Sequence, residues 1–326
     1  MPPEPIQTET ATPSPEVVVA RPAATATTPA ATATRPPPTP RPSPTRRPSA
    51  TFTSTPTRSP SPTPSPQPTP PPTPNALTLR KGTWEVAAYP FATHLQRVPS
   101  EAAPGFTFLR LDWDAYQGAN PRPAPTALPS LVLENPWLRA VVVPDLGGRV
   151  AELLYKPTGH DELYRNPVLK PTHWGPPEQG WWLAAGGMEW CLPVPEHGYL
   201  WVEAWQARAV DGAEAAAVVL ESPPGPPLSM QVTVRLPADE AALHLGFRIR
   251  NQADRPISFA YWTNAMLAPG GENRSSEGLR FLLPADEVQV HSTGDPRLPS
   301  AGQRASWPVW NGIALDRPMR WDGWLG

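Results

Sequence analysis

Cysteine is nearly absent from this chain, since Cys191 is the single thiol among 326 residues. One thiol excludes an intrachain disulfide and a metal site built from cysteines alone. Low cysteine content does not decide between compartments. Most histidines are scattered without the close spacing of transition-metal sites, so we expect no metal ion. These scattered residues are His94, His160, His173, His244 and His291.

Long apolar runs and an excess of one charge sign are missing as well. No run of about 18 apolar residues is present, so the sequence predicts no transmembrane helix. The formal net charge is −2, which gives no argument for nucleic acid or an anionic membrane as a partner. Walker, dinucleotide-binding and Gly-x-Ser-x-Gly motifs are also absent. We therefore expect no cofactor.

Aromatic residues are almost absent from residues 1–74, where Phe52 is the exception. This segment holds nearly half of the 52 prolines, together with many Thr, Ser and Ala residues. It cannot bury enough apolar surface to offset the entropy of ordering, so we predict a disordered spacer with polyproline II character. Its six arginines against three glutamates are too dilute for a nucleic-acid arm.

The composition of this spacer also bears on location. A Pro/Thr/Ser tether before a folded domain is typical of bacterial surface or secreted proteins. We therefore expect an extracellular or cell-surface location, with the cytoplasm as the alternative. The sequence after Met1 lacks the basic and apolar regions of a signal peptide. We expect the true start of the gene, with an export signal or anchor, to lie upstream.

The remaining residues, 75–326, hold all 14 tryptophans and are predicted to form one large β domain. Several segments alternate apolar and polar residues, as half-buried antiparallel strands do. Many short strands between Gly and Pro turns predict a β-sandwich, and no segment has convincing helical periodicity. The predicted strands are Phe106–Trp113, Leu131–Asn135, Leu138–Val143, Val150–Tyr155, Ser229–Leu236, Ala242–Arg250 and Ile257–Trp262, with a hairpin between the fifth and the sixth.

The densest group of polar residues lies in residues 186–198. Paired glycines let a backbone approach a ligand, and Glu189 beside His197 offers an acceptor and a titratable donor. The alternative is that both side chains only hydrogen-bond the loop backbone. Arg149 follows a Gly-Gly turn, and its planar donor fork suits sugar hydroxyls or a carboxylate. Its alternative is a surface arginine at the start of a strand.

Tryptophans cluster around the same loop, at Trp181, Trp182, Trp190, Trp201 and Trp205. Aromatic faces stack on the C–H faces of pyranose rings, which favours saccharide binding. The alternative is that these residues are core or loop anchors. We expect one or two of them to be exposed to ligand, with Trp181 or Trp182 as the best candidate.

The order and spacing of these residues resemble the galactose mutarotase-like superfamily, and most closely an uncharacterised branch of bacterial mutarotase-like proteins. The resemblance covers roughly residues 80–326 and includes two strands joined by the turn at 144–149. In mutarotase-like epimerases, a comparable Gly-Gly segment and a His-Gly-aromatic motif line the sugar cleft. Gly187, Glu189, His197 and Gly198 match that pattern. The resemblance implies a two-sheet β-supersandwich.

Two departures from the family argue against full mutarotase activity. In aldose 1-epimerases a strand end reads Thr-Asn-His-aromatic, and this histidine protonates the ring oxygen; here the chain reads Thr263-Asn264-Ala265. The family's base is a glutamate near the end of the domain, and we expect its position to lie beyond Gly326, in a domain truncated at its C-terminus. Mutarotation needs both an acid and a base. Trp262 and Asn264 remain candidate sugar contacts.

Three hypotheses follow. The first is a carbohydrate-binding domain related to aldose epimerases, with a mono- or oligosaccharide as partner and without full mutarotase activity. The second is an active epimerase or other sugar-processing enzyme, in which His197 and Glu189 serve as catalytic acid and base. The third is a surface scaffold that presents a protein-binding face on a stalk. The aromatic, glycine-rich loop favours the first two over the third.

Overall fold

The computed structural model describes residues 77–194, 196–321, 323 and 325. The predicted disordered spacer, residues 1–74, lies outside these residues. Strands dominate what is described, with one short α-helix and two 3-10 turns, so the fold is mostly β as the sequence predicts. Within these ranges no helix combines the length and the apolar character that a membrane crossing requires.

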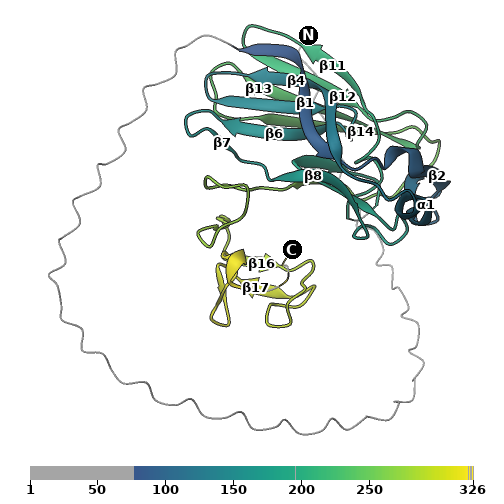
Figure 1. Ribbon diagram of the computed structural model, residues 1–326. Coiled ribbons are helices and arrows are strands. Elements are labelled where there is room, and N and C mark those ends of the chain that lie inside the picture. The colour runs from purple at the N-terminus through teal and green to yellow at the C-terminus, as the bar shows by residue number, and fades with distance from the viewer. Residues whose placement is uncertain (1–76, 195, 322, 324, 326) are drawn as a thin grey trace, which may run out of the picture. The chain divides into compact units, whose positions relative to one another are not determined.

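The largest element is a curved nine-stranded sheet (Figure 1). Its strands are antiparallel except where β1 pairs β8 in parallel, and β7 (His160–Asp161) branches from β6. In spatial order the other strands are β15 (Trp262–Ala265), β10 (Met188–Cys191), β6 (Arg149–Tyr155), β5 (Leu138–Val143), β4 (Ala124–Glu134), β1 (Thr78–Ala88), β8 (Arg165–Thr172) and β9 (Trp182–Gly186).

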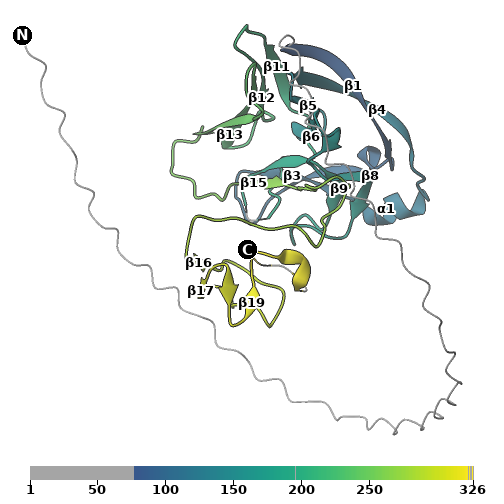
Figure 2. The ribbon, with the colours of Figure 1, turned by 90° about the vertical axis from the view of Figure 1, so that its left-hand side faces the viewer.

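A second, four-stranded antiparallel sheet faces one side of the first (Figure 2). Its order is that of the sequence, so each strand returns beside the previous one through a short connection. The strands are β11 (Gln206–Val210), β12 (Ala215–Glu221), β13 (Leu228–Pro237) and β14 (His244–Asn251).

Two hydrophobic cores lie on the two faces of the large sheet. Neighbouring strand residues point to opposite faces, so Leu133 faces the second sheet, while Val132 faces away from it. The first core fills the space between the sheets and includes Val232 of β13. The second core lies on the outer face of the large sheet, where β3 (Thr107–Leu111) and α1 (Trp113–Gly118) contribute to it. The candidate site belongs to this outer face.

Most predicted strands are confirmed within a few residues. Strands β5 and β6 match the predicted pair around the Gly-Gly turn, and β13 and β14 form the predicted hairpin. The segment at 206–221 contains two strands, β11 and β12, joined by a short turn. The structure shows one large and one smaller β-sheet. Assignment of this arrangement to the supersandwich type is a proposal.

Two sequence predictions are wrong in detail. A short helix, α1, follows the strand at 107–111, because Asp112 caps its N-terminus by accepting a hydrogen bond from the Ala115 amide at 3.0 Å. One turn and a half is too short to show helical periodicity. The predicted strand Ile257–Trp262 pairs only from Trp262 onward, since the preceding backbone runs along the 192–199 loop, where the Ala260 amide donates to the Pro193 carbonyl.

The C-terminal residues form small two-stranded ribbons with a core of their own. Leu298, Ala305 and Leu315 are buried there, against the half-buried Trp307 and Trp310. The strands and turn are β16 (Glu287–Gln289), β17 (Arg304–Ser306), β18 (Val309–Trp310), β19 (Ile313–Ala314) and η2 (Pro318–Arg320). The remaining N-terminal elements are η1 (Ala92–His94) and β2 (Leu95–Pro99), which pairs β3.

Candidate functional site

The edge strand β15 and its neighbour β10 place four side chains on one face of the large sheet. Strand β10 pairs β15 so that Glu189 lies opposite Asn264, and Cys191 lies opposite Trp262. Side chains alternate along a strand, so Trp190, between Glu189 and Cys191, points instead into the core between the sheets. The site therefore lies on the outer face of the large sheet.

The turn before β6 delivers Arg149 to Glu189. Gly147 has a φ of +68°, and a Cβ at that position would lie 2.2 Å from the Trp201 carbonyl oxygen, so the turn requires glycine. Arg149 is 1% exposed. Its Nη1 donates to the Gly186 carbonyl at 2.5 Å and its Nη2 donates to Glu189 Oε2 at 2.6 Å. The expectation that Arg149 meets a sugar directly is therefore corrected, because its bonds turn inward.

Gly187 also has a structural role. Its φ is +76°, and a Cβ would lie 2.5 Å from the Val150 carbonyl oxygen. The close approach is between β10 and β6, which by itself accounts for glycine here, and ligand contact at Gly187 stays a prediction. The matched residue Gly198 closes the following loop, where the next amide, that of Tyr199, donates to the Leu192 carbonyl at 2.8 Å.

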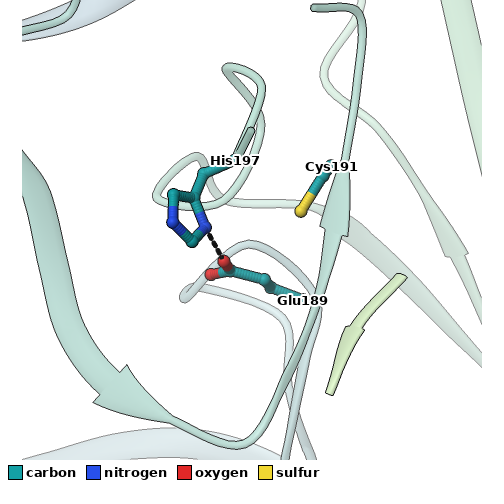
Figure 3. A group of neighbouring side chains, drawn as sticks. All are labelled: Glu189, Cys191 and His197. Atoms are coloured by element: carbon teal, nitrogen blue, oxygen red, sulfur yellow. Dashed lines mark hydrogen bonds and ion pairs between the residues drawn. The ribbon is translucent and has the colours of Figure 1, made fainter. Parts of the chain in front are cut away.

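His197 lies above Glu189 and points its Nδ1 at the carboxylate (Figure 3). The Nδ1–Oε1 distance is 2.5 Å, and the Asn264 amide donates to the same oxygen at 2.9 Å. A carboxylate only accepts, so the proton of the pair belongs on Nδ1. Glu189 is thus bonded through both oxygens and is fully buried. Glu189 and His197 therefore bond each other directly, and their role as a functional pair stays a prediction.

The charge state of Glu189 follows from these contacts. Burial alone would raise its pKa, but the Arg149 charge and the hydrogen bonds from His197 and Asn264 outweigh burial. The pKa of Glu189 falls to about 2. The carboxylate is therefore ionised throughout the neutral range, and it fixes the orientation and tautomer of the His197 ring. His197 Nε2 has no hydrogen-bond partner in the described part of the chain.

Three indoles surround the His197 ring. Trp182 stacks on it at 4.7 Å between centroids, with 28° between the planes. Trp174 meets it edge-on at 5.3 Å, and Trp262 lies 6.1 Å away. Trp174 is 66% exposed and Trp262 is 42% exposed, whereas Trp182 is 9% exposed. We call Trp174, Trp182, Trp262 and His197 the aromatic rim.

The neighbouring Trp181 does not belong to this rim. Its side chain is fully buried, its Nε1 donates to the Leu109 carbonyl at 2.8 Å, and it packs edge-on against Trp201 at 4.8 Å. The expectation that Trp181 presents a face to ligand is wrong, because residues 181 and 182 point to different surroundings. Three further predicted candidates are core residues as well: Trp190, Trp201 and Trp205.

Trp174 is the functional candidate that sequence reasoning missed. It lies in the segment His173-Trp174-Gly175-Pro176-Pro177, ahead of the glycine-rich motif. The available signal was an aromatic residue in a Pro-rich, loop-forming stretch. Only the folded chain brings it against Trp182, at 5.5 Å, and against His197.

Glu189, Cys191 and His197 also form a potential set of metal ligands (Figure 3). Their donor atoms lie within 4.8 Å of one another. Burial and the nearby Glu189 charge raise the pKa of the Cys191 thiol well above its usual range, so it is protonated. The Arg149 guanidinium already supplies the cation beside Glu189. Arg149, Glu189 and His197 thus form a hydrogen-bonded chain in which the carboxylate already has a cationic partner.

Comparison with known proteins identifies a similar solved structure and a matching family model. A solved structure, a TPR-domain containing protein from Parabacteroides distasonis ATCC 8503, matches 58% of this chain with 20% identity and a TM-score of 0.47. The match spans 32% of that protein's chain, about a third of its length. The family model described as "Domain of unknown function (DUF5107)" matches residues 111–317, which include the whole candidate site. The chain belongs to the DUF5107 family.

Proposed function

We propose that this chain is a carbohydrate-binding domain of the mutarotase-like β-supersandwich type, with its sugar-binding surface at the aromatic rim. The observation that carries the proposal is the exposure of Trp174 and Trp262 next to an oriented histidine. Indole faces stack on the apolar faces of sugar rings. The protein presents such faces beside polar groups, which is the composition that sugar recognition requires.

The polar groups of the site suit hydroxyl recognition. His197 Nε2 can accept a hydrogen bond from a sugar hydroxyl while Nδ1 remains bound to Glu189. The opposite charges of Arg149 and Glu189 compensate each other at 2.6 Å, so the site offers no net charge from this pair. A neutral mono- or oligosaccharide fits these properties. Contact with the sugar falls to His197, Trp174, Trp262 and the part-buried Asn264.

A second candidate function, a sugar-processing enzyme, is favoured by the Glu189–His197 pair. A carboxylate that orients imidazole Nδ1 leaves Nε2 as a general base or acid. The missing family histidine at position 265 weighs little against this function. Ala265 lies opposite Met188 and packs against the core between the sheets, so a side chain there would not reach the aromatic rim. His197 is the histidine on the site's own face.

The decisive experiment measures binding and catalysis on the same variants. Calorimetric titration with a panel of neutral mono- and oligosaccharides should show binding that Trp174→Ala and Trp262→Ala weaken about tenfold each, through lost stacking. Trp310→Ala, in the C-terminal ribbons, is the matched control and should bind normally. Polarimetry then separates the functions: acceleration of mutarotation that vanishes in His197→Ala would establish the enzyme.

If calorimetry shows no saccharide binding and polarimetry shows no acceleration of mutarotation, the surface-scaffold hypothesis becomes the favoured one. Saccharide binding that survives both tryptophan substitutions would contradict the proposed sugar-binding surface. We place the domain outside the cell or at its surface, also as a proposal, which rests on the Pro/Thr/Ser composition of residues 1–74. Detection of the chain in intact bacteria with a surface-restricted label tests that location.

A further inference from the structure

The outward face of the four-stranded sheet is separate from the aromatic rim. Along β13, Met230, Val232 and Val234 are buried in the core between the sheets. The residues between them, and their partners on the adjacent strands, therefore point outward. These outward residues of β13 and β14 are half-buried or exposed, so this face meets solvent.

Four arginines gather on this outward face. Arg248 lies opposite Gln231 and Arg250 lies opposite Ser229, both across the β13–β14 ladder. Arg235 follows two rungs further along β13, and Arg208 enters from the edge strand β11, opposite Val219. We call Arg208, Arg235, Arg248 and Arg250 the arginine face.

These guanidiniums lack carboxylate partners. None of the four forms an ion pair with an Asp or Glu among the residues that the structure describes. Glu221 is the one acidic residue among the outward positions of these strands, and it accepts a hydrogen bond from Gln231 at 3.2 Å. The charge of His244, at the end of the face, is already matched by Glu240 at 2.7 Å. Four positive charges against one carboxylate is a local excess on a chain with net charge −2.

The face is also hollowed. A cavity of about 380 Å³ is lined by Arg248 and Arg250 together with donors from Ser229, Gln231 and Gln252, and Glu221 contributes one carboxylate to the same lining. Next to this cavity, Gly246 has no side chain to cover the strands. A Cβ added there would have Thr233 as its nearest neighbour, at 3.7 Å, so the space above it is open. From Arg250 to the rung of Arg235 the strip runs six residues, about 20 Å at the usual strand rise. An extended ligand fits this strip better than a single small ion.

We propose that the arginine face binds an acidic polysaccharide, a chain whose sugars carry carboxylate or sulfate groups. The planar fork of arginine matches oxyanions in two-point contacts, and the chain uses arginine at all four positions. Single-stranded nucleic acid is a poorer match, because base stacking needs exposed aromatic faces. None of the outward positions of β11–β14 carries Phe, Tyr or Trp: Phe247 points to the other side, where its ring centroid lies 5.7 Å from that of Trp190.

The test measures binding of polygalacturonate and heparin to the full chain, with neutral dextran as the uncharged polymer. We expect both acidic polymers to bind, with affinity that falls as salt rises, and dextran to leave no signal at this face. Arg248→Glu/Arg250→Glu should weaken binding by roughly a hundredfold, about tenfold per arginine. Arg122→Glu/Arg320→Glu, with the same charge change at exposed arginines elsewhere, should bind within about twofold of the parent chain.

Each other outcome overturns the proposal. Unchanged affinity in Arg248→Glu/Arg250→Glu removes the site, and salt-independent binding removes its ionic basis. Equal affinity for single-stranded DNA would replace the polysaccharide with a nucleic-acid ligand. Arg248→Gln/Arg250→Gln, which adds no negative charge, guards against a folding artefact: it should melt like the parent chain and still lose most of the binding.

Discussion

The two sheets differ in whether the charged side chains on their outer faces are buried in ion pairs or exposed to solvent. On the large sheet, Arg149, Glu189 and His197 are buried and bonded to one another. On the small sheet, Arg248 and Arg250 are exposed and form no ion pair within the described ranges. Buried charges must be paired, whereas exposed charges are solvated at little cost. The first face therefore holds a fixed geometry, and the second keeps its charge available to an external anion.

The largest expected effect comes from breaking the buried pair. Glu189→Gln removes the charge that compensates Arg149, and the guanidinium remains 1% exposed. Removing one partner of a buried ion pair typically destabilises a protein by about 3–5 kcal/mol. Urea unfolding followed by circular dichroism should show this loss.

A matched variant separates charge from packing. In Arg149→Met/Glu189→Leu both charges are replaced by apolar side chains, and we expect it to recover part of the lost stability. If Glu189→Gln unfolds like the parent chain, the contrast between the two faces disappears.

Acid should weaken the large-sheet site in a defined range. The pKa of Glu189 is about 2 in the folded chain against an ordinary value of 4.5. A lowered folded pKa contributes stability above the unfolded pKa and loses it as pH falls towards the folded pKa. We expect about 3 kcal/mol to be lost between pH 5 and 2 through this group. Urea unfolding across that range measures it, and Glu189→Gln should show a flatter profile.

The turn that carries Arg149 should be intolerant of any side chain. Gly147→Ala places a Cβ 2.2 Å from backbone atoms of Trp201 at a φ of +68°. Backbone atoms cannot rotate away as a side chain can, so we expect a loss of about 2–4 kcal/mol. A melting temperature equal to that of the parent chain would show that the turn can move and that Arg149 is not rigidly delivered.

The sequence predicts the positions of strands far better than it predicts which face of the sheet each side chain points to. Alternation located β13 and β14, because a period of two is a property of local sequence. A shift of one residue exchanges the two faces of a strand. This explains why Ala265 faces the core between the sheets while the adjacent Asn264 faces the site.

The remaining surprises depend on contacts between distant segments. Trp174 reaches His197 across 23 positions of sequence, and no local pattern encodes that approach. The pairing of Glu189 with His197 was predictable, since only eight positions of sequence separate them. The ion pair between Arg149 and Glu189 could not be predicted from the sequence, because it depends on the pairing of β6 with β10.

The smallest effect belongs to the small sheet and has the opposite sign. Gly246 lies inside β14 with a φ that ordinary residues adopt, and a Cβ there would make only a normal contact with Thr233 at 3.7 Å. Glycine loses more backbone freedom on folding than alanine does, so Gly246→Ala should stabilise the chain by about 0.5 kcal/mol. Urea unfolding beside Gly147→Ala makes the comparison direct, with the same added methyl group on each sheet. Destabilisation by Gly246→Ala would mean that the outward face is packed rather than open, and the hollow next to Arg248 would then be unable to receive a polymer.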